Sequence, residues 1–82
     1  MLMSLDRSAP EPLRDQLADL IRSKIVDGTW PTRTAIPSIT SLASDYGVAV
    51  ITVQKAIAIL KGEGLLFGVP GKGTFVAEGS RP

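Results

Sequence analysis

Apolar residues recur every three or four positions in three stretches of the chain, which is the spacing of one face of an α-helix. Proline suits the first turn of a helix and glycine its end, so the first stretch is predicted to form a helix between Pro12 and Gly28. Its apolar positions are Leu13, Leu17, Leu20, Ile21 and Ile25. The loop that follows contains Trp30, which is interpreted as a core residue beneath the loop.

The other two helical stretches meet at Gly47. Residues 39–46 follow Ser38, whose hydroxyl can cap a helix by accepting a free amide hydrogen. Residues 50–61 form the third predicted helix, with the inward positions Val53, Ala56, Ile57 and Leu60. The sharp turn between the two helices requires a positive φ, which glycine adopts without strain. Val48, next to this turn, is expected to anchor it in the core.

The hydrophobic pattern changes at Gly62 and Gly64, which end the third helix. A strand begins at residues 65–67, residues 69–72 form a turn, and residues 73–76 form the return strand of a hairpin. Ala35 and Ile36 predict a further, very short strand. The predicted fold is mainly α with a small β-hairpin. It is a winged helix-turn-helix of three helices plus a wing.

The chain is long enough for one small domain, which we predict at residues 12–77. Pro10 and Pro12 disfavour regular structure before it, so residues 1–11 are predicted to be a flexible N-terminal arm. Residues 78–82 are predicted to be a polar C-terminal tail. A core this small gives marginal stability, which favours a dimer or a larger parent protein.

The composition argues against catalysis, because the chain contains no cysteine and no histidine. Thiolate metal sites, cysteine nucleophiles and the most common general base are therefore absent. The eight carboxylates are scattered without metal-ligand spacing. We therefore predict no enzyme activity, no metal and no cofactor. No apolar run reaches the ~20 residues of a membrane span, and the N-terminus lacks the pattern of a signal peptide, so a cytoplasmic protein is expected.

A helix-turn-helix can place its second helix in the major groove of DNA, where side chains reach the base edges. In this chain that helix is residues 50–61, and the hairpin directly after it can contact the flanking backbone. The formal net charge is only +1, which is weak for a nucleic-acid binder.

The chain resembles the N-terminal DNA-binding domain of GntR-type bacterial transcription regulators over about residues 12–77. The resemblance rests on the joint order and spacing of several short motifs. They are Pro12-Leu13 with Gln16, Ile36-Pro37-Ser38, Leu42-Ala43, Tyr46-Gly47-Val48, Thr52-Val53, Ala56, Leu60, Glu63-Gly64-Leu65 and Gly71-Lys72-Gly73-Thr74-Phe75-Val76.

This resemblance implies a sequence-specific DNA-binding transcriptional regulator, commonly a repressor, that acts as a homodimer on a palindromic operator. Recognition helices would enter successive major grooves of double-stranded DNA, and the wing tip would reach a minor groove. Members usually carry a larger C-terminal domain that senses a metabolite. The predicted DNA-binding residues are Ser38, Thr40, Ala49, Val50, Ile51, Thr52, Gln54, Lys55, Gly71, Lys72 and Gly73.

The chain departs from the family pattern where arginines usually contact DNA. Thr40 stands at one such position, and Val50 and Gln54 stand at two others. Ala49 also replaces the hydroxyl residue that usually caps the third helix. Each lost phosphate contact removes about one counterion from the salt dependence of binding.

Two functions therefore remain open. Gln54 can pair with adenine, and Val50 or Ile51 can touch thymine methyl groups, so one hypothesis is an A·T-leaning operator. The alternative is a winged-helix protein-interaction module with a degenerate DNA face, because exposed apolar residues often mark protein contacts. Its partner would bind through Val50 and Ile51. A scaffold fragment without independent activity is a third reading.

Overall fold

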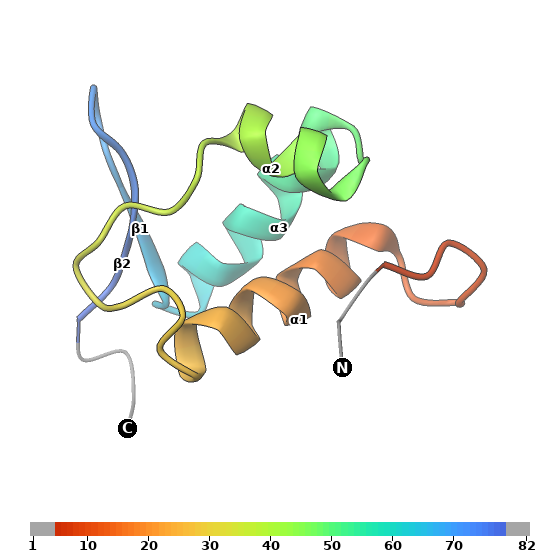
Figure 1. The fold of residues 1–82 in the computed structure, drawn as a ribbon, viewed down its shortest axis with the longest axis horizontal. Coiled ribbons are helices and arrows are strands. Elements are labelled where there is room, and N and C mark those ends of the chain that lie inside the picture. The colour runs from red at the N-terminus through yellow and green to blue at the C-terminus, as the bar shows by residue number, and fades with distance from the viewer. Residues whose placement is uncertain (1–4, 79–82) are drawn as a thin grey trace.

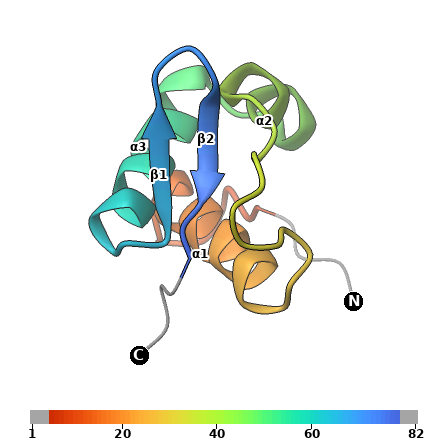
Figure 2. The same ribbon diagram turned by 90° about the vertical axis from the view of Figure 1, so that its left-hand side faces the viewer.

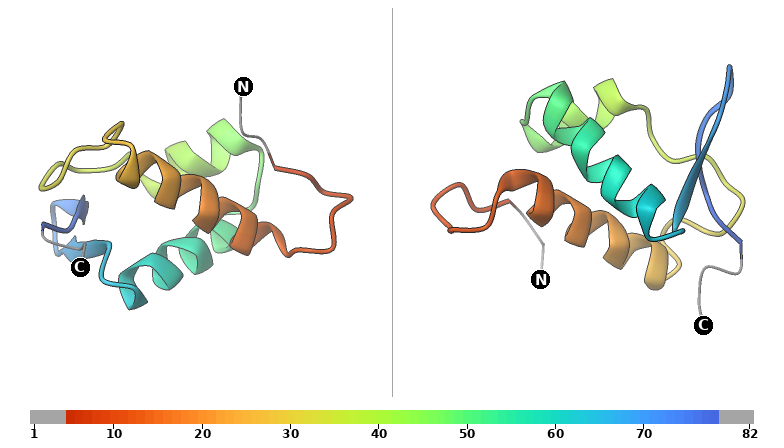
Figure 3. Two further views of the ribbon diagram at one scale, coloured as in Figure 1. Left: turned by 90° about the horizontal axis from the view of Figure 1, so that it is seen from below. Right: turned by 180° about the vertical axis from the view of Figure 1, so that it is seen from behind.

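The computed structural model describes residues 5–78 and contains three helices and one hairpin. The elements are α1 (Leu13–Val26), α2 (Ile39–Tyr46), α3 (Val50–Gly62), β1 (Leu66–Val69) and β2 (Gly73–Val76). Figure 1 shows α1 beneath α2 and α3, with the hairpin standing at one end of the helices. Seen from behind, α3 descends from the α2–α3 turn and leads into β1 (Figure 3). The predicted order of elements is confirmed.

One hydrophobic core joins the three helices and the hairpin. The predicted inward stripe of α3 is buried, and Leu17, Val53 and Leu60 are fully inaccessible to solvent. In the predicted stripe of α1, Leu17, Leu20 and Ile21 are buried, whereas Leu13 and Ile25 at its two ends are only partly buried. From below, Figure 3 shows α1 running alongside α3. Trp30 is half-buried and packs against this core, as expected, with the Lys24 ammonium 5.8 Å from the centre of its ring. Val48 is also half-buried against the core.

The hairpin is antiparallel, with Leu66 opposite Val76 and Phe67 opposite Phe75. Leu66 and Val76 are buried, whereas Phe67 is exposed, because successive side chains of a strand point to opposite faces. The segment before α2 runs alongside β2 (Figure 2). It forms a single bridge, between Ala35 and Phe75, in place of the short strand predicted at residues 35–36.

The N-termini of α2 and α3 are capped unequally. The Ser38 hydroxyl accepts a hydrogen bond of 3.1 Å from the Ser41 amide and so caps α2 as predicted. Gly47 ends α2 with φ +65°, the left-handed conformation that its position requires. At the start of α3, Ala49 has an extended backbone and provides no side-chain cap.

An Ala49→Ser substitution is expected to stabilise the domain by about 0.5–1 kcal/mol, because the new hydroxyl can accept a free amide hydrogen of α3. The backbone of Ala49 (φ −69°, ψ 151°) closely matches that of Ser38 (φ −64°, ψ 160°), which already caps α2. Urea unfolding measures the change. Ala58→Ser, at an exposed position within α3, is the control and is expected to give no gain. Equal effects of the two substitutions would contradict the capping argument.

Residues 5–11, which belong to the predicted N-terminal arm, contact α1 and the core. Gln16 holds this segment against α1: its side chain accepts a 2.7 Å hydrogen bond from the Asp6 amide and donates to the carbonyls of Asp6 and Glu11. Leu5 packs against the core. The prolines exclude a helix here, but they leave these carbonyl groups free to bind Gln16. Residues 1–4 of the predicted arm and residues 79–82 of the predicted tail lie outside the described residues.

An ion pair fastens the end of α3 to α1. Arg22 donates to both carboxylate oxygens of Glu63, at 2.9 and 2.6 Å, and also pairs with Asp19. These hydrogen bonds lower the pKa of Glu63 and raise that of Arg22. Three charged residues, Asp19, Arg22 and Glu63, are thereby paired with one another where the end of α3 meets α1.

Within residues 5–78, no single helix is long and apolar enough to cross a membrane. The pair α2 and α3 reaches the required length and apolarity only when taken together, across a bend of 115°.

Candidate nucleic-acid interface

The first turns of α3 present a mixed apolar and polar surface to solvent. Val50 and Ile51 are 41% and 54% exposed, and Gln54 and Lys55 are also exposed. Thr52 is half-buried beside them. The core residues Val53 and Ala56 hold this face outward, since they fix the rotation of α3 about its axis. The predicted recognition residues of α3 therefore occupy one accessible face.

A hollow of about 330 Å³ brings the start of α2 together with the wing. Ser38 and Thr40 line it from α2, and Lys72 and Gly73 line it from the hairpin. Ile57 of α3 also lines it. Site residues that are more than thirty positions apart in the sequence thus share one concave surface.

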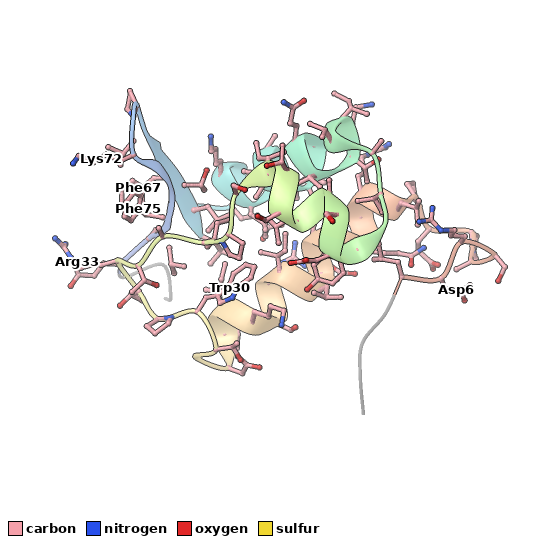
Figure 4. All side chains as sticks on the ribbon, turned by 45° about the horizontal axis from the view of Figure 1, so that its top comes forward. Asp6, Trp30, Arg33, Phe67, Lys72 and Phe75 are labelled. Atoms are coloured by element: carbon pink, nitrogen blue, oxygen red, sulfur yellow. The ribbon has the colours of Figure 1, made fainter. Side chains whose placement is uncertain are left out.

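The wing tip carries positive charge on a backbone with little side-chain cover. Gly71 and Gly73 flank Lys72 at the turn, and both have positive φ. Lys61 of α3 lies behind the wing, and its ammonium would be 3.1 Å from a β-carbon placed on Gly68. Lys61 and Lys72 line the same open depression. Gly68 also lines it and, having no side chain, leaves space for the Lys61 ammonium. Figure 4 shows Lys72 on the hairpin, well away from the segment that carries Asp6.

The opposite face of the hairpin carries an aromatic pair that the sequence reasoning did not single out. Phe67 and Phe75 stack with ring centroids 5.8 Å apart, directly across the two strands. Arg33 lies next to them, where its guanidinium pairs with Glu78 at 2.8 Å. Figure 4 shows these rings on the side of the hairpin turned away from the helices. The alternation of β1 and β2 around the buried Leu66 and Val76 is the signal that identifies this face.

The candidate interface is lined mainly by hydrogen-bond donors and apolar side chains. Within residues 5–78, no group of His, Cys, Asp or Glu side chains has the arrangement of a metal site. Hydroxyls, an amide and ammonium groups line the candidate interface, and these are donors for phosphate oxygens and base edges.

The family model for bacterial regulatory proteins of the gntR family matches residues 13–76. The chain belongs to this GntR family. The match covers all three helices and both strands, so it spans the whole winged helix described above.

Two curated proteins with sequences similar to this GntR domain are named repressors. The histidine utilization repressor of Klebsiella aerogenes is 38% identical over 78 residues, which are 95% of this chain and 32% of that protein. The transcriptional repressor NagR of Bacillus subtilis is 30% identical over 76 residues, which are 93% of this chain and 31% of that protein. The chain spans about a third of the length of these relatives.

Solved structures of GntR-type domains share the fold. YtrA from Sulfolobus acidocaldarius, a GntR-family transcription factor, superposes with a TM-score of 0.85 at 32% identity, over 95% of this chain and 82% of that chain. The AraR(DBD), in complex with operator ORX1, gives a TM-score of 0.83 at 33% identity, over 94% of this chain and 99% of that chain. The predicted family and fold are confirmed. The matches also favour a transcriptional regulator over a protein-interaction module.

Proposed function

We propose that this GntR domain binds double-stranded DNA with sequence specificity and acts as a transcriptional regulator. The proposal rests on two observations: the start of α2 and the wing tip line one concave surface, and the first turns of α3 are exposed to solvent. A duplex laid across this surface meets α3 in its major groove and the wing at the neighbouring minor groove. The related AraR(DBD) has been solved in complex with operators, which supports DNA binding by this domain.

The side chains of the proposed interface fall into two groups: those that contact base edges and those that contact phosphates. Gln54 pairs with an adenine edge, and Val50 and Ile51 contact thymine methyl groups, which together favour A·T pairs. The donors at the rim of the site hold phosphates and set the register on the duplex. These donors are Ser38, Thr40, Thr52, Lys55 and Lys72, with the backbone at Ala49, Gly71 and Gly73.

The whole regulator is proposed to be a repressor that works as a homodimer on a palindromic operator. Two related proteins are named repressors, which supports the direction of regulation. A homodimer with two-fold symmetry binds a palindromic operator, because each of its two recognition helices contacts one half-site. This proposed function requires no catalysis and no cofactor. The regulator is proposed to bind chromosomal DNA in the cytoplasm.

Lys72→Ala is expected to weaken binding to all DNA sequences by a similar factor, because a wing-tip lysine contacts phosphate and not a base edge. The slope of log K against log salt is expected to become shallower by about 0.9, the value for one phosphate contact. Fluorescence anisotropy with labelled duplexes at several salt concentrations measures both effects.

Lys24→Ala is the matched control, since it removes the same charge from the last turn of α1. It is expected to leave the slope unchanged. A Lys72→Ala variant that binds one duplex normally and another weakly would show that Lys72 reads bases, and would contradict its assignment to phosphate.

A further inference from the structure

The segment before α1 reaches the turn that precedes the recognition helix. The Arg7 guanidinium donates a hydrogen bond to the Gly47 carbonyl, 40 residues further along the chain. Gly47 is the residue that ends α2, and Val50 begins α3 only three positions later. Gln16 fixes the same segment to α1 through both Asp6 and Glu11. Arg7 is therefore held beside the start of α3 by its own hydrogen bond to Gly47 and by the contacts of Gln16 with the neighbouring backbone.

Arg7 differs from the other arginines of the described residues in its charge environment. Arg14, Arg22 and Arg33 each lie within 4.0 Å of a carboxylate, whereas Arg7 forms no ion pair within residues 5–78. The adjacent carboxylate, Asp6, accepts hydrogen bonds from the Ser8 amide and hydroxyl at 3.0 and 2.6 Å. These bonds, chiefly that of the hydroxyl, lower the pKa of Asp6. The charge of Arg7 is thus not neutralised by a partner in this part of the chain.

The recognition helix lacks such a charge of its own. Within α2 and α3 the basic residues are Lys55 and Lys61, and neither lies in the first turn of α3. A guanidinium has several N–H donors in a fixed plane, so one can remain on the Gly47 carbonyl while others bind an anion. Phosphate oxygens match this geometry well.

We infer that Arg7 is a DNA-binding residue, which contacts a backbone phosphate next to the head of α3. The inference rests on the proposed function, and it makes residues 5–11 part of the DNA interface. The hydrogen bond to Gly47 places the guanidinium before DNA arrives, so less side-chain freedom is lost on binding. Arg7 thereby supplies, from outside the helix-turn-helix, a positive charge that the first turn of α3 does not carry.

The competing interpretation is that Arg7 only tethers the α2–α3 turn. A tether affects stability and the placement of α3, but it releases no counterions from DNA. Salt dependence separates the two, because each phosphate neutralised by a cationic side chain adds about 0.9 to the slope of log K against log salt.

The test compares the wild-type chain with Arg7→Gln, Arg7→Lys and Arg33→Gln by anisotropy, on a duplex recovered by selection with the wild type. Arg33 is the matched control because it is exposed and paired with Glu78 on the outer side of the hairpin. Arg7→Gln is expected to make the slope shallower by about 0.9. Arg7→Lys keeps the charge and is expected to retain the slope, and Arg33→Gln is expected to leave it unchanged. Thermal unfolding of each variant shows whether the fold is intact.

An unchanged slope for Arg7→Gln, with or without a loss of affinity, would overturn the inference and leave Arg7 as a tether. A slope lost equally in Arg33→Gln would overturn it as well, since the effect would then be one of net charge. Absence of salt-dependent binding by the wild-type chain would instead refute the proposed function, and the inference with it.

Discussion

Replacing Leu60 with alanine is expected to destabilise the domain by about 2–5 kcal/mol, the cost of deleting a fully buried leucine side chain. Leu60 has no exposed surface and lies in the core formed by the helices and the hairpin. A chain of 82 residues typically has a free energy of unfolding of only ~4–12 kcal/mol. The substitution therefore removes a large part of it, and at the upper end of the range leaves much of the protein unfolded.

Urea unfolding followed by circular dichroism measures this loss. Ile51→Ala is the control on the same helix, because it truncates a branched aliphatic side chain that is 54% exposed. Its stability is expected to change by no more than about 0.5 kcal/mol. Equal losses for Leu60→Ala and Ile51→Ala would mean that the predicted inward and outward faces of α3 are wrongly assigned. DNA affinity distinguishes the two faces of α3 as well. Ile51→Ala is expected to weaken DNA binding while the protein stays folded, since Ile51, unlike Leu60, belongs to the proposed interface.

Replacing Gln54 with alanine is expected to cost ~1–3 kcal/mol of discrimination at one base pair of each half-site, the value of one bidentate base contact. This corresponds to roughly 5- to 150-fold in relative affinity at that position. The exposed amide of Gln54 can accept and donate at an adenine edge, whereas alanine can do neither.

Selection from a random duplex library measures the consensus of the wild type and of Gln54→Ala. The wild type is expected to select A·T pairs under the head of α3, and the variant to accept several bases at one of these positions. Lys72→Ala is the contrasting variant, with an unchanged consensus and a uniform loss of affinity. A G·C-rich wild-type consensus over the major-groove contacts would contradict the assignment of Val50, Ile51 and Gln54.

The fold was largely predictable because its main signals are local. Apolar periodicity located α1, α2 and α3 to within a residue or so, since each helix buries one stripe against the same core. Ser38 and Gly47 marked their helix ends through the capping bond and the positive φ that the structure shows. The pairing of Ala35 with Phe75 was less predictable, because the two residues are 40 positions apart in the sequence. The bridge is made by backbone groups, so it does not depend on which side chains the two residues carry.

The candidate site was predictable only in part, for a related reason. Helical spacing placed Gln54 and Ile51 on one exposed face, and the structure bears this out. The hollow that brings Thr40 near Lys72 depends on how the hairpin packs on α3, which no short motif encodes. The role of Arg7 was missed because prolines indicated an irregular arm, whereas Gln16, ten residues from Asp6, holds that arm in place.

This winged helix has no arginine on its recognition helix, and we propose that it binds DNA through phosphate contacts made from several elements. The most direct measurement is anisotropy of the wild-type chain with a selected duplex and an unrelated duplex over a series of salt concentrations. We expect tighter binding to the selected duplex than to the unrelated one, and for both duplexes log affinity should fall linearly as log salt rises. Binding that is absent at low salt, or that does not respond to salt, would contradict the proposal.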